Sequence, residues 1–305
     1  MESIFSGILA ILMSFLTMVS GLFNLPSNNT GSTQPNGKDG VGFEEQVEGT
    51  IRIMSFNIRC TNVGKMEWDD RLPLVTATIL NGHPDSIGVQ EATTEWMEAL
   101  NETLGEEYAS VGVGRDDGVH AGEHSAIFYL KDKYTVVDSG NFWLSETPDV
   151  PSKSWGAGNN RICTWVILKN NETGEQFVHL NSHFDNGSAE ARAHSVDMIL
   201  DKAAEFDDMP VVFTADMNIE EGSVDYKNIT ENGTLRDAKH ATTDTMNYLT
   251  YHDTKPLLHK NEVIDFIMVN GKFDVKKYRV ITDGIDGNKY VSDHYPIYAD
   301  IAFKA

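Results

Sequence analysis

The stretch YVSDHYPIYADI, residues 290–301, decides the fold of this 305-residue chain. Asp293 and His294 stand side by side directly before an apolar run. Neighbouring residues of a strand point to opposite faces of its sheet, so one site can use both side chains only if they lie on the loop that feeds the strand. Pro296 supports a loop at this point. The stretch therefore predicts a polar loop at the start of a final buried strand.

The same arrangement recurs along the chain, because other short apolar runs are also followed by polar or acidic residues. We expect strands at residues 50–59, 85–91, 124–130, 162–168, 176–184, 210–218, 263–269 and 296–303. Helical periodicity predicts helices near residues 70–81, 93–104 and 188–206, and Ser188 is placed to cap the last of them. Many strands, few long helices and no internal repeat predict two packed sheets flanked by helices in one domain.

The N-terminal segment predicts export. Residues 3–23 carry no charge and are long enough to enter or span a bilayer, so residues 1–23 are either a cleaved signal peptide or an uncleaved membrane anchor. No Lys or Arg precedes Lys38 to fix the orientation. Residues 24–49 are rich in Asn, Gly, Ser and Thr and indicate a flexible linker, which leaves residues 50–305 as the folded domain. We expect a secreted or extracytoplasmic membrane-anchored monomer.

Asn-x-Ser/Thr sequons fit an exported glycoprotein. They begin at Asn28, Asn101, Asn171, Asn186, Asn228 and Asn232. Two cysteines, Cys60 and Cys163, allow one disulfide, although two buried free thiols are the preferred interpretation.

The chain is strongly acidic, with 46 Asp and Glu residues against 24 Lys and Arg residues and a formal net charge of -22. This balance excludes broad electrostatic capture of nucleic acid, which needs Lys and Arg to replace counterions at the phosphates. A local cationic site remains compatible with it. Adaptation to high salt would produce the same imbalance.

Polar side chains gather at the ends of the expected strands, where loops on a rigid scaffold carry function. In chain order they are Asn57, Glu91, Glu123, Arg161, His183, Asp185, Asp216, Asn218, Asp265, Asp293 and His294. Each of them alone has a structural explanation, such as ending a strand or capping a turn. As an ordered set, they indicate a hydrolytic site.

The motifs SFNIR, QE, NSHFD, ADMN, IDFI and SDH occur in this order from about residue 50 onward. The set resembles the endonuclease/exonuclease/phosphatase superfamily, whose fold is that of pancreatic-type deoxyribonuclease, and the segment at 140–165 resembles secreted bacterial or archaeal-type members. The resemblance implies an α/β four-layer sandwich with two packed, mostly antiparallel sheets between layers of helices. It also implies a divalent-metal-dependent phosphoesterase.

The resemblance implies Mg²⁺ as the cofactor, with Mn²⁺ or Ca²⁺ as alternatives. Its main ligand would be Glu91, helped by Asn57, while Asp293 would face the metal or its waters; hard cations of this kind prefer oxygen ligands. His294 would act as the general base, because an imidazole near its own pKa takes a proton from water when a carboxylate orients it. Asp265 is the implied orienting carboxylate.

His183 and Glu123 resemble a second His-acid pair that contacts the phosphate and assists departure of the leaving oxygen. Asp216 and Asn218 are two residues apart, so on an extended segment both point the same way, to position the nucleophile or hold a second metal. Arg161 offers a bidentate fork to phosphate oxygens, with an ordinary salt bridge as the alternative.

The leading hypothesis is an exported nuclease-like hydrolase of phosphodiester bonds, and its partner is a phosphate ester, either nucleic acid or a small molecule or lipid head group. The alternatives are a phosphomonoesterase or phospholipase-type hydrolase and a non-catalytic binding module on the same fold. A zinc site has little support, because no Cys-x-x-Cys spacing occurs. Trp155, in a Gly-rich loop, is the tryptophan proposed to stack against substrate.

Overall fold

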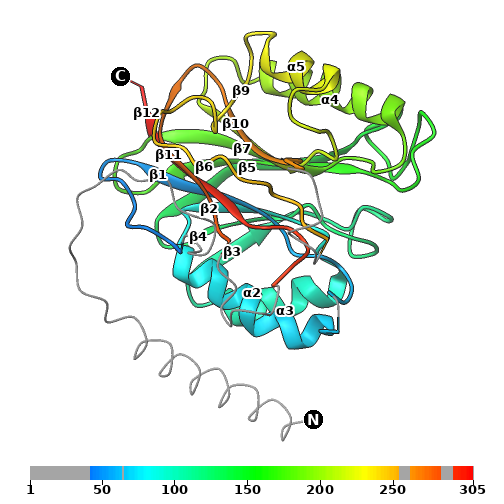
Figure 1. The fold of residues 1–305 in the computed structure, drawn as a ribbon, viewed down its shortest axis with the longest axis horizontal. Helices are drawn as coiled ribbons and strands as arrows, with labels where there is room; N and C mark the ends of the chain where they lie inside the picture. The colour runs from blue at the N-terminus through cyan, green and yellow to red at the C-terminus, as the bar shows by residue number, and fades with distance from the viewer. Residues whose placement is uncertain (1–41, 64, 254–261, 283–290, 305) are drawn as a thin grey trace, which may run out of the picture. The chain divides into compact units, whose positions relative to one another are not determined.

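The computed structural model describes residues 42–63, 65–253, 262–282 and 291–304. Within this part of the chain, two six-stranded sheets pack face to face and helices cover the outer face of each (Figure 1). The expected four-layer α/β sandwich is therefore confirmed. The predicted targeting element and residues 24–41 of the predicted linker lie outside the described residues. No helix in the described ranges is long and apolar enough to cross a membrane.

The first sheet has the order β11-β12-β1-β2-β4-β3, and only its β1/β2 pair is parallel. Its strands are β1 (Ile51–Asn57), β2 (Ser86–Gln90), β3 (Tyr108–Val111), β4 (Ile127–Leu130), β11 (Phe273–Val280) and β12 (Ile297–Phe303). The polar stretch that precedes β12 is a loop, as residues 290–301 predicted.

The second sheet has the order β5-β6-β7-β8-β10-β9, and only its β7/β8 pair is parallel. Its strands are β5 (Tyr134–Trp143), β6 (Ile162–Asn170), β7 (Gln176–His183), β8 (Val211–Asp216), β9 (Arg236–Asp237) and β10 (Asp265–Val269). Both sheets are thus mostly antiparallel, with one parallel pair at the centre of each.

Two helices cover each sheet. They are α2 (Trp68–Gly82) and α3 (Thr94–Leu104) on the first, and α4 (Ala189–Ala204) and α5 (Val224–Thr230) on the second. Ser188 caps α4 as expected, since its side chain accepts a hydrogen bond from the Ala191 N–H. One face of α3 is buried, and Trp96 on this face is completely enclosed against the first sheet.

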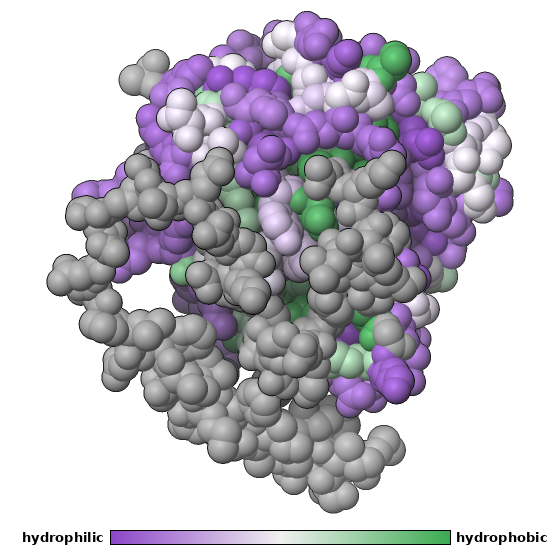
Figure 2. Space-filling view, in the orientation of Figure 1, coloured by the Kyte–Doolittle hydropathy of each residue, from purple (hydrophilic) through white to green (hydrophobic). Residues whose placement is uncertain are grey.

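Three hydrophobic layers hold the sandwich together. One lies between the sheets and includes Phe177 and Phe273, and the other two lie under the helix pairs. Phe43, near the end of the predicted linker, stacks on Tyr298 of β12 with ring centroids 5.7 Å apart, so the last residues before the domain pack onto the first sheet. The outer surface is mainly hydrophilic where Figure 2 shows it over α4 and α5.

The strand directions bring polar residues to one end of the sandwich. Asn57 ends β1, Glu91 follows β2, His183 ends β7 and Asp216 ends β8. Because β1 packs against β8 and β10, and β2 packs against β7 and β8, these carboxyl ends converge across the two sheets.

Candidate active site

Three expected site residues lie in one row across the second sheet. The register pairs His183 with Asp216 across β7 and β8, and pairs Asp216 with Asp265 across β8 and β10. Directly paired residues project to the same face of a sheet, so the three side chains meet. The Nε2 of His183 lies 3.5 Å from Asp216 Oδ2.

His294 reaches this row from the loop before β12. Its Nδ1 lies 2.8 Å from Asp265 Oδ2, and its Nε2 lies 3.7 Å from Asp216 Oδ2. The structure therefore contains the expected His294–Asp265 pair, and Asp216 lies between two imidazoles. Asp265 fixes the ring so that Nε2 is the nitrogen turned toward Asp216.

The proton affinity of this cluster follows from its burial. Burial alone lowers the pKa of His294, but the carboxylates of Asp265 and Asp216 outweigh it and raise the pKa to about 10. Burial raises the pKa of Asp216 to about 7, against the opposing field of His294. In the metal-free protein His294 therefore carries its proton at neutral pH and has to lose it before it can act as a base.

The Glu91 carboxylate accepts hydrogen bonds from two N–H donors. Its Oε1 accepts a hydrogen bond from Asn57 Nδ2 at 3.1 Å, and its Oε2 accepts one from the Cys60 backbone N–H at 3.0 Å. Burial opposes the charge on Glu91, but the fields of His183 and Arg59 together with these donors lower its pKa to about 2. Glu91 is therefore an ionised, buried carboxylate, as a metal ligand must be.

Asn57 joins the two sheets at this point. Besides Glu91, its Nδ2 donates to Asp216 Oδ2 at 2.8 Å, while its Oδ1 accepts the Arg59 backbone N–H at 3.0 Å. Its amide thus bridges a carboxylate of the first sheet and a carboxylate of the second.

Arg59 was not selected from the sequence, although it ends the SFNIR motif. Its Nη1 lies 3.6 Å from Asp293 Oδ2 and 3.8 Å from Glu91 Oε1, so it partly neutralises both carboxylates. Asp293 is buried, and its Oδ1 lies 3.3 Å from Ser292 Oγ. Asp293 is thus placed close to Glu91, where the sequence predicted it.

The second predicted pair is looser than expected. His183 Nδ1 lies 3.9 Å from Glu123 Oε2 and has no hydrogen-bond partner in the described part of the chain. Glu123 instead accepts two hydrogen bonds from Arg115, at 2.7 and 3.0 Å. A guanidinium fork matches a carboxylate in this bidentate way, which an imidazole cannot do. The sequence analysis did not select Arg115. The only feature that could have marked it is its place in the GRDDG turn, eight residues before Glu123.

Arg161 is 5% exposed, yet its Nε and Nη1 have no hydrogen-bond partner among the residues described. The nearest carboxylate, Asp185, lies 3.7 Å from Nε and is already occupied by the backbone N–H groups of Gly158, Asn159, Gly187 and Ser188. Burial and the neighbouring Arg115 lower the pKa of Arg161. The salt bridge that was the alternative interpretation of Arg161 is therefore weak. The buried guanidinium keeps N–H donors that bind nothing in the described part of the chain.

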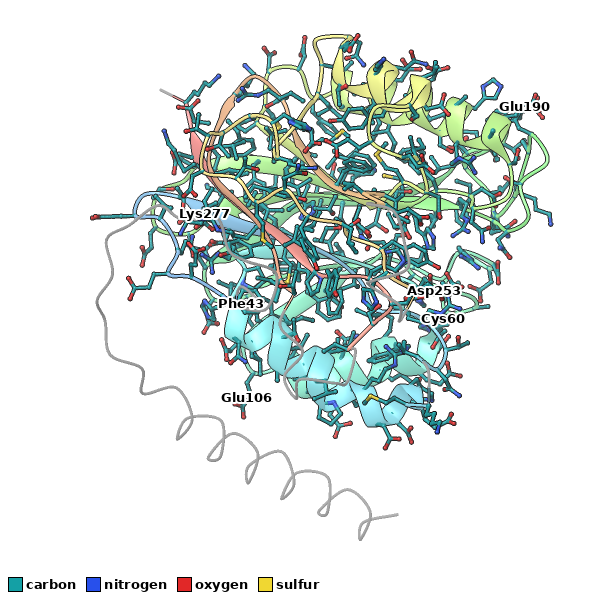
Figure 3. The ribbon with its side chains drawn as sticks, viewed as in Figure 1. Phe43, Cys60, Glu106, Glu190, Asp253 and Lys277 are labelled. Atoms are coloured by element: carbon teal, nitrogen blue, oxygen red, sulfur yellow. The ribbon has the colours of Figure 1, made fainter. Side chains whose placement is uncertain are left out.

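Most of these groups border one cavity of about 560 Å³, but Asn57, Asp185, Asp265 and Asp293 are not part of its lining. Its lining includes Arg59, Cys60, Glu91, Arg115, Glu123, Asn159, Arg161, His183, Asn186, Asp216, Asn218, Glu220, Tyr251, Glu262 and His294. The cavity lies at the end of the sandwich that carries Cys60, at the right of Figure 3, away from Phe43 and Lys277.

Asn218 lines the cavity from a left-handed backbone conformation, with φ of 48°. Its N–H donates to Asp216 Oδ1 and its Nδ2 donates to the Phe184 carbonyl, both at 3.0 Å. Tyr251, which the sequence analysis missed, lies over the His294 ring with centroids 4.8 Å apart. It stands in a stretch without periodicity, so no sequence pattern marked it.

The remaining expectations have mixed outcomes. Trp155 does not line the cavity; it stacks on His194 of α4 with ring centroids 4.2 Å apart, so its role as a substrate platform has no support. Both cysteines are free, as preferred, but Cys60 is only half-buried and lines the cavity.

Comparisons with known proteins agree with this geometry. The chain is similar to an endonuclease/exonuclease/phosphatase of Bacteroides vulgatus (36% identity, TM-score 0.79, covering 84% of this chain and 99% of that one). It is also similar to a mannosyl-6-phosphatase of Bacteroides thetaiotaomicron (33% identity, TM-score 0.78, covering 83% and 100%). The human nocturnin catalytic domain shares the fold at 19% identity (TM-score 0.67, covering 85% and 97%). No curated protein matches the chain.

The sequence profile described as Endonuclease/Exonuclease/phosphatase family matches residues 54–294, which include every site residue described above. The chain therefore belongs to the endonuclease/exonuclease/phosphatase family of phosphoester hydrolases.

Proposed function

We propose that this chain is an exported, divalent-metal-dependent phosphoesterase that cleaves a P–O bond by attack of water. The observation that carries the proposal is the composition of one cavity, which is lined both by ionised carboxylate and by the buried, under-bonded cation Arg161. A phosphate ester bound together with a metal ion satisfies both kinds of group.

The side chains present fit a hard divalent cation. Glu91 is ionised. The carboxylate oxygens of Glu91 and Glu123 lie close enough together to hold an ion, and so do those of Asp216 and Asp265. We propose Mg²⁺, or Mn²⁺ or Ca²⁺, held mainly by Glu91 with Asp293 facing its waters. Such an ion would neutralise the charge that grows on the phosphoryl oxygens.

The chain's own residues would transfer the proton, position the water and bind the phosphoryl oxygens. In its deprotonated form, His294 accepts the proton of the attacking water at Nε2 while Asp265 holds Nδ1, and Asp216 and Asn218 position that water. Arg161 donates to phosphoryl oxygens, because its unused N–H groups are oriented by burial before substrate arrives.

The central test compares Glu91→Gln and His294→Ala with a surface control, Glu102→Gln, which changes an exposed carboxylate of α3. We expect each site variant to lose about a hundredfold or more of hydrolysis while keeping its circular dichroism spectrum, and the control to keep full activity. Turnover in wild-type protein should disappear with a chelator. Retained hydrolysis in both site variants would remove the proposed mechanism.

Two substrate classes fit this site. The pair of histidines, His183 and His294, supports the phosphodiester reaction that the sequence analysis put first. Glu220 and Glu262 favour a small phosphate monoester, because these acidic groups line the cavity and would repel a long polyanion. The likeness to the mannosyl-6-phosphatase supports the same class, so we propose a sugar-phosphate-like monoester as the second candidate.

A substrate panel separates these classes. It contains a sugar 6-phosphate, an inositol phosphate, an aryl phosphate monoester and its diester, sphingomyelin, RNA and plasmid DNA, each with Mg²⁺ and with chelator. A monoesterase should prefer the sugar phosphate to the aryl diester by about a hundredfold or more. The opposite order would favour the phosphodiesterase.

Export is part of the proposal and rests on residues 1–23 of the sequence. Fractionation of the producing cell and sequencing of the mature N-terminus would distinguish a cleaved signal peptide from a retained anchor. Recovery of the unprocessed chain inside the cell would contradict export.

A further inference from the structure

Arg71, in the first turn of α2, is completely buried and has no carboxylate within 4.0 Å in the described ranges. A buried arginine is normally paired with an acid, because an unpaired buried charge is costly. Instead, its hydrogen bonds within the described part of the chain go to backbone carbonyls. Nη1 donates to Ile58 at 2.6 Å and to Val291 at 2.8 Å, and Nη2 donates to Arg59 at 2.7 Å and to Thr61.

Three of these carbonyls belong to the loop that follows β1, so residues 58–61 wrap around the guanidinium. Arg59 occupies the left-handed region with φ of 59°, an unfavourable conformation for a residue with a side chain. The carbonyls of this loop point to Arg71, whereas its N–H groups point the other way. The Arg59 N–H donates to Asn57 Oδ1, and the Cys60 N–H donates to Glu91 Oε2.

The fourth carbonyl belongs to the loop that carries the base. Val291 accepts from Arg71, and the next residue, Ser292, donates its hydroxyl to the Asn57 carbonyl at 2.6 Å. Asp293 and His294 follow directly. One guanidinium thus connects the loop that holds Glu91 with the loop that presents His294.

We propose that Arg71 is a positioning residue, which fixes the metal-binding loop and the base-carrying loop relative to each other without touching substrate. The inference rests on the proposed function for its consequences for metal affinity and kinetics, but not for its effect on loop opening. A planar fork is needed for this role, because one ammonium group cannot reach carbonyls on two loops in fixed directions.

The test compares Arg71→Lys with Arg52→Lys in the full-length chain. Arg52 is a matched control because it is also buried, at the opposite end of β1, where it pairs with Asp300 at 2.7 Å. Mn²⁺ affinity is measured by calorimetry, and amide hydrogen exchange is followed at residues 58–61 and 291–294. Arg71→Met, without charge, is the second variant.

We expect Arg71→Lys to weaken Mn²⁺ binding by about 10- to 100-fold, as loss of a group supporting a metal ligand typically does, and to accelerate exchange in both loops. Its kcat should fall by a similar factor while KM changes less than about threefold, since Arg161 is untouched. Arg52→Lys should leave Mn²⁺ affinity and exchange in both loops unchanged.

Unchanged Mn²⁺ affinity and loop exchange in both Arg71→Lys and Arg71→Met would overturn the proposal, and so would equal effects of the Arg71 and Arg52 variants. If one Arg71 variant fails to fold, the other gives the measurement. If no substrate is hydrolysed by wild-type protein, the proposed function fails, whereas the exchange results still decide the role of Arg71.

Discussion

Asp216 is the carboxylate that three side chains of the site surround. Its Oδ2 accepts a hydrogen bond from Asn57 and faces an imidazole nitrogen of both His183 and His294. The sequence predicted this residue from the ADMN motif. It could not predict how closely Asp216 approaches two histidines from other segments, because that depends on the register of β7, β8 and β10.

The free donors of Arg161 lead to a kinetic prediction. Arg161→Lys keeps the charge but loses the fork, so KM should rise by about tenfold or more, since a hydrogen bond to a charged group is worth about 1.5–3 kcal/mol. Steady-state kinetics on the best substrate of the panel would measure this. Arg279→Lys, which changes an arginine bonded to Glu44, is the control and should leave KM unchanged. An unaltered KM in Arg161→Lys would make this arginine structural.

The proton held by His294 predicts how stability depends on pH in the presence of chelator. Its folded pKa of about 10 lies above the ordinary value of 6.5, so the protonated form stabilises the fold fully below pH 6.5, and this contribution is lost as pH rises through about 10. Asp216, with a pKa raised from 3.8 to about 7, acts in the same direction at lower pH. Between about pH 6.5 and about pH 10, stability should therefore fall as pH rises.

Urea denaturation between about pH 6.5 and about pH 10 would measure this fall, since the folded state binds more protons over that range. His294→Asn, which cannot take up the proton, should show a flatter profile above pH 7. Identical profiles for the two proteins would contradict the assignment of the raised pKa to His294.

At the scale of elements, the strands that the sequence predicted are those buried on both faces, such as β1 and β8. The strands it missed were β3, β5, β9 and β11, and the missed helix was α5. Polar and charged residues interrupt β5 and β11, which lie at sheet edges and carry bulges near Val136 and Val275. An edge strand buries less side-chain surface, so its apolar pattern is weak.

The two sheets approach each other closely at Gly88 of β2. A Cβ there would lie 2.1 Å from Thr214 Oγ1 and 2.4 Å from Asn181 Oδ1 of the second sheet. Asn181 in turn accepts from Gln90 Nε2 at 2.8 Å, so β2 is fixed against β7 by buried hydrogen bonds. This contact determines where β2 delivers Glu91.

Gly88→Ala should destabilise the fold by about 1–3 kcal/mol, because the added methyl group meets well-packed atoms, and it should also weaken metal binding by moving Glu91. Chemical denaturation and calorimetry would measure the two effects. Gly271→Ala is the matched control, since a Cβ at that position meets nothing within 4 Å. Wild-type stability in Gly88→Ala would show that the sheets separate without cost.

At the scale of the whole molecule, the net charge of -22 surrounds the site that we propose binds a phosphate ester. A long polyanion is then repelled before it reaches Arg161, and added salt screens that repulsion. For any hydrolysis of plasmid DNA, KM should fall between about 50 mM and about 500 mM salt, whereas KM for a small monoester should change little. A KM for DNA that rises steeply with salt would indicate counterion release from a cationic surface and contradict this account.

The sequence predicted the fold from its buried strands, and the structure brings most of the predicted site residues together because their motifs follow strands that converge. Arg59, Arg115 and Tyr251 were missed because they lie on irregular segments, whose positions are set by tertiary contacts rather than by local pattern.

The position of β12 between β1 and β11 has a consequence for biosynthesis. This strand follows every other strand of the sandwich along the chain, and it pairs directly with the first of them. A nascent chain still lacks β12 and the loop that carries His294 while its earlier parts emerge from the ribosome. On the proposed mechanism, translation therefore delays hydrolytic competence, and an incomplete polypeptide would not attack the phosphate esters of the cell that makes it.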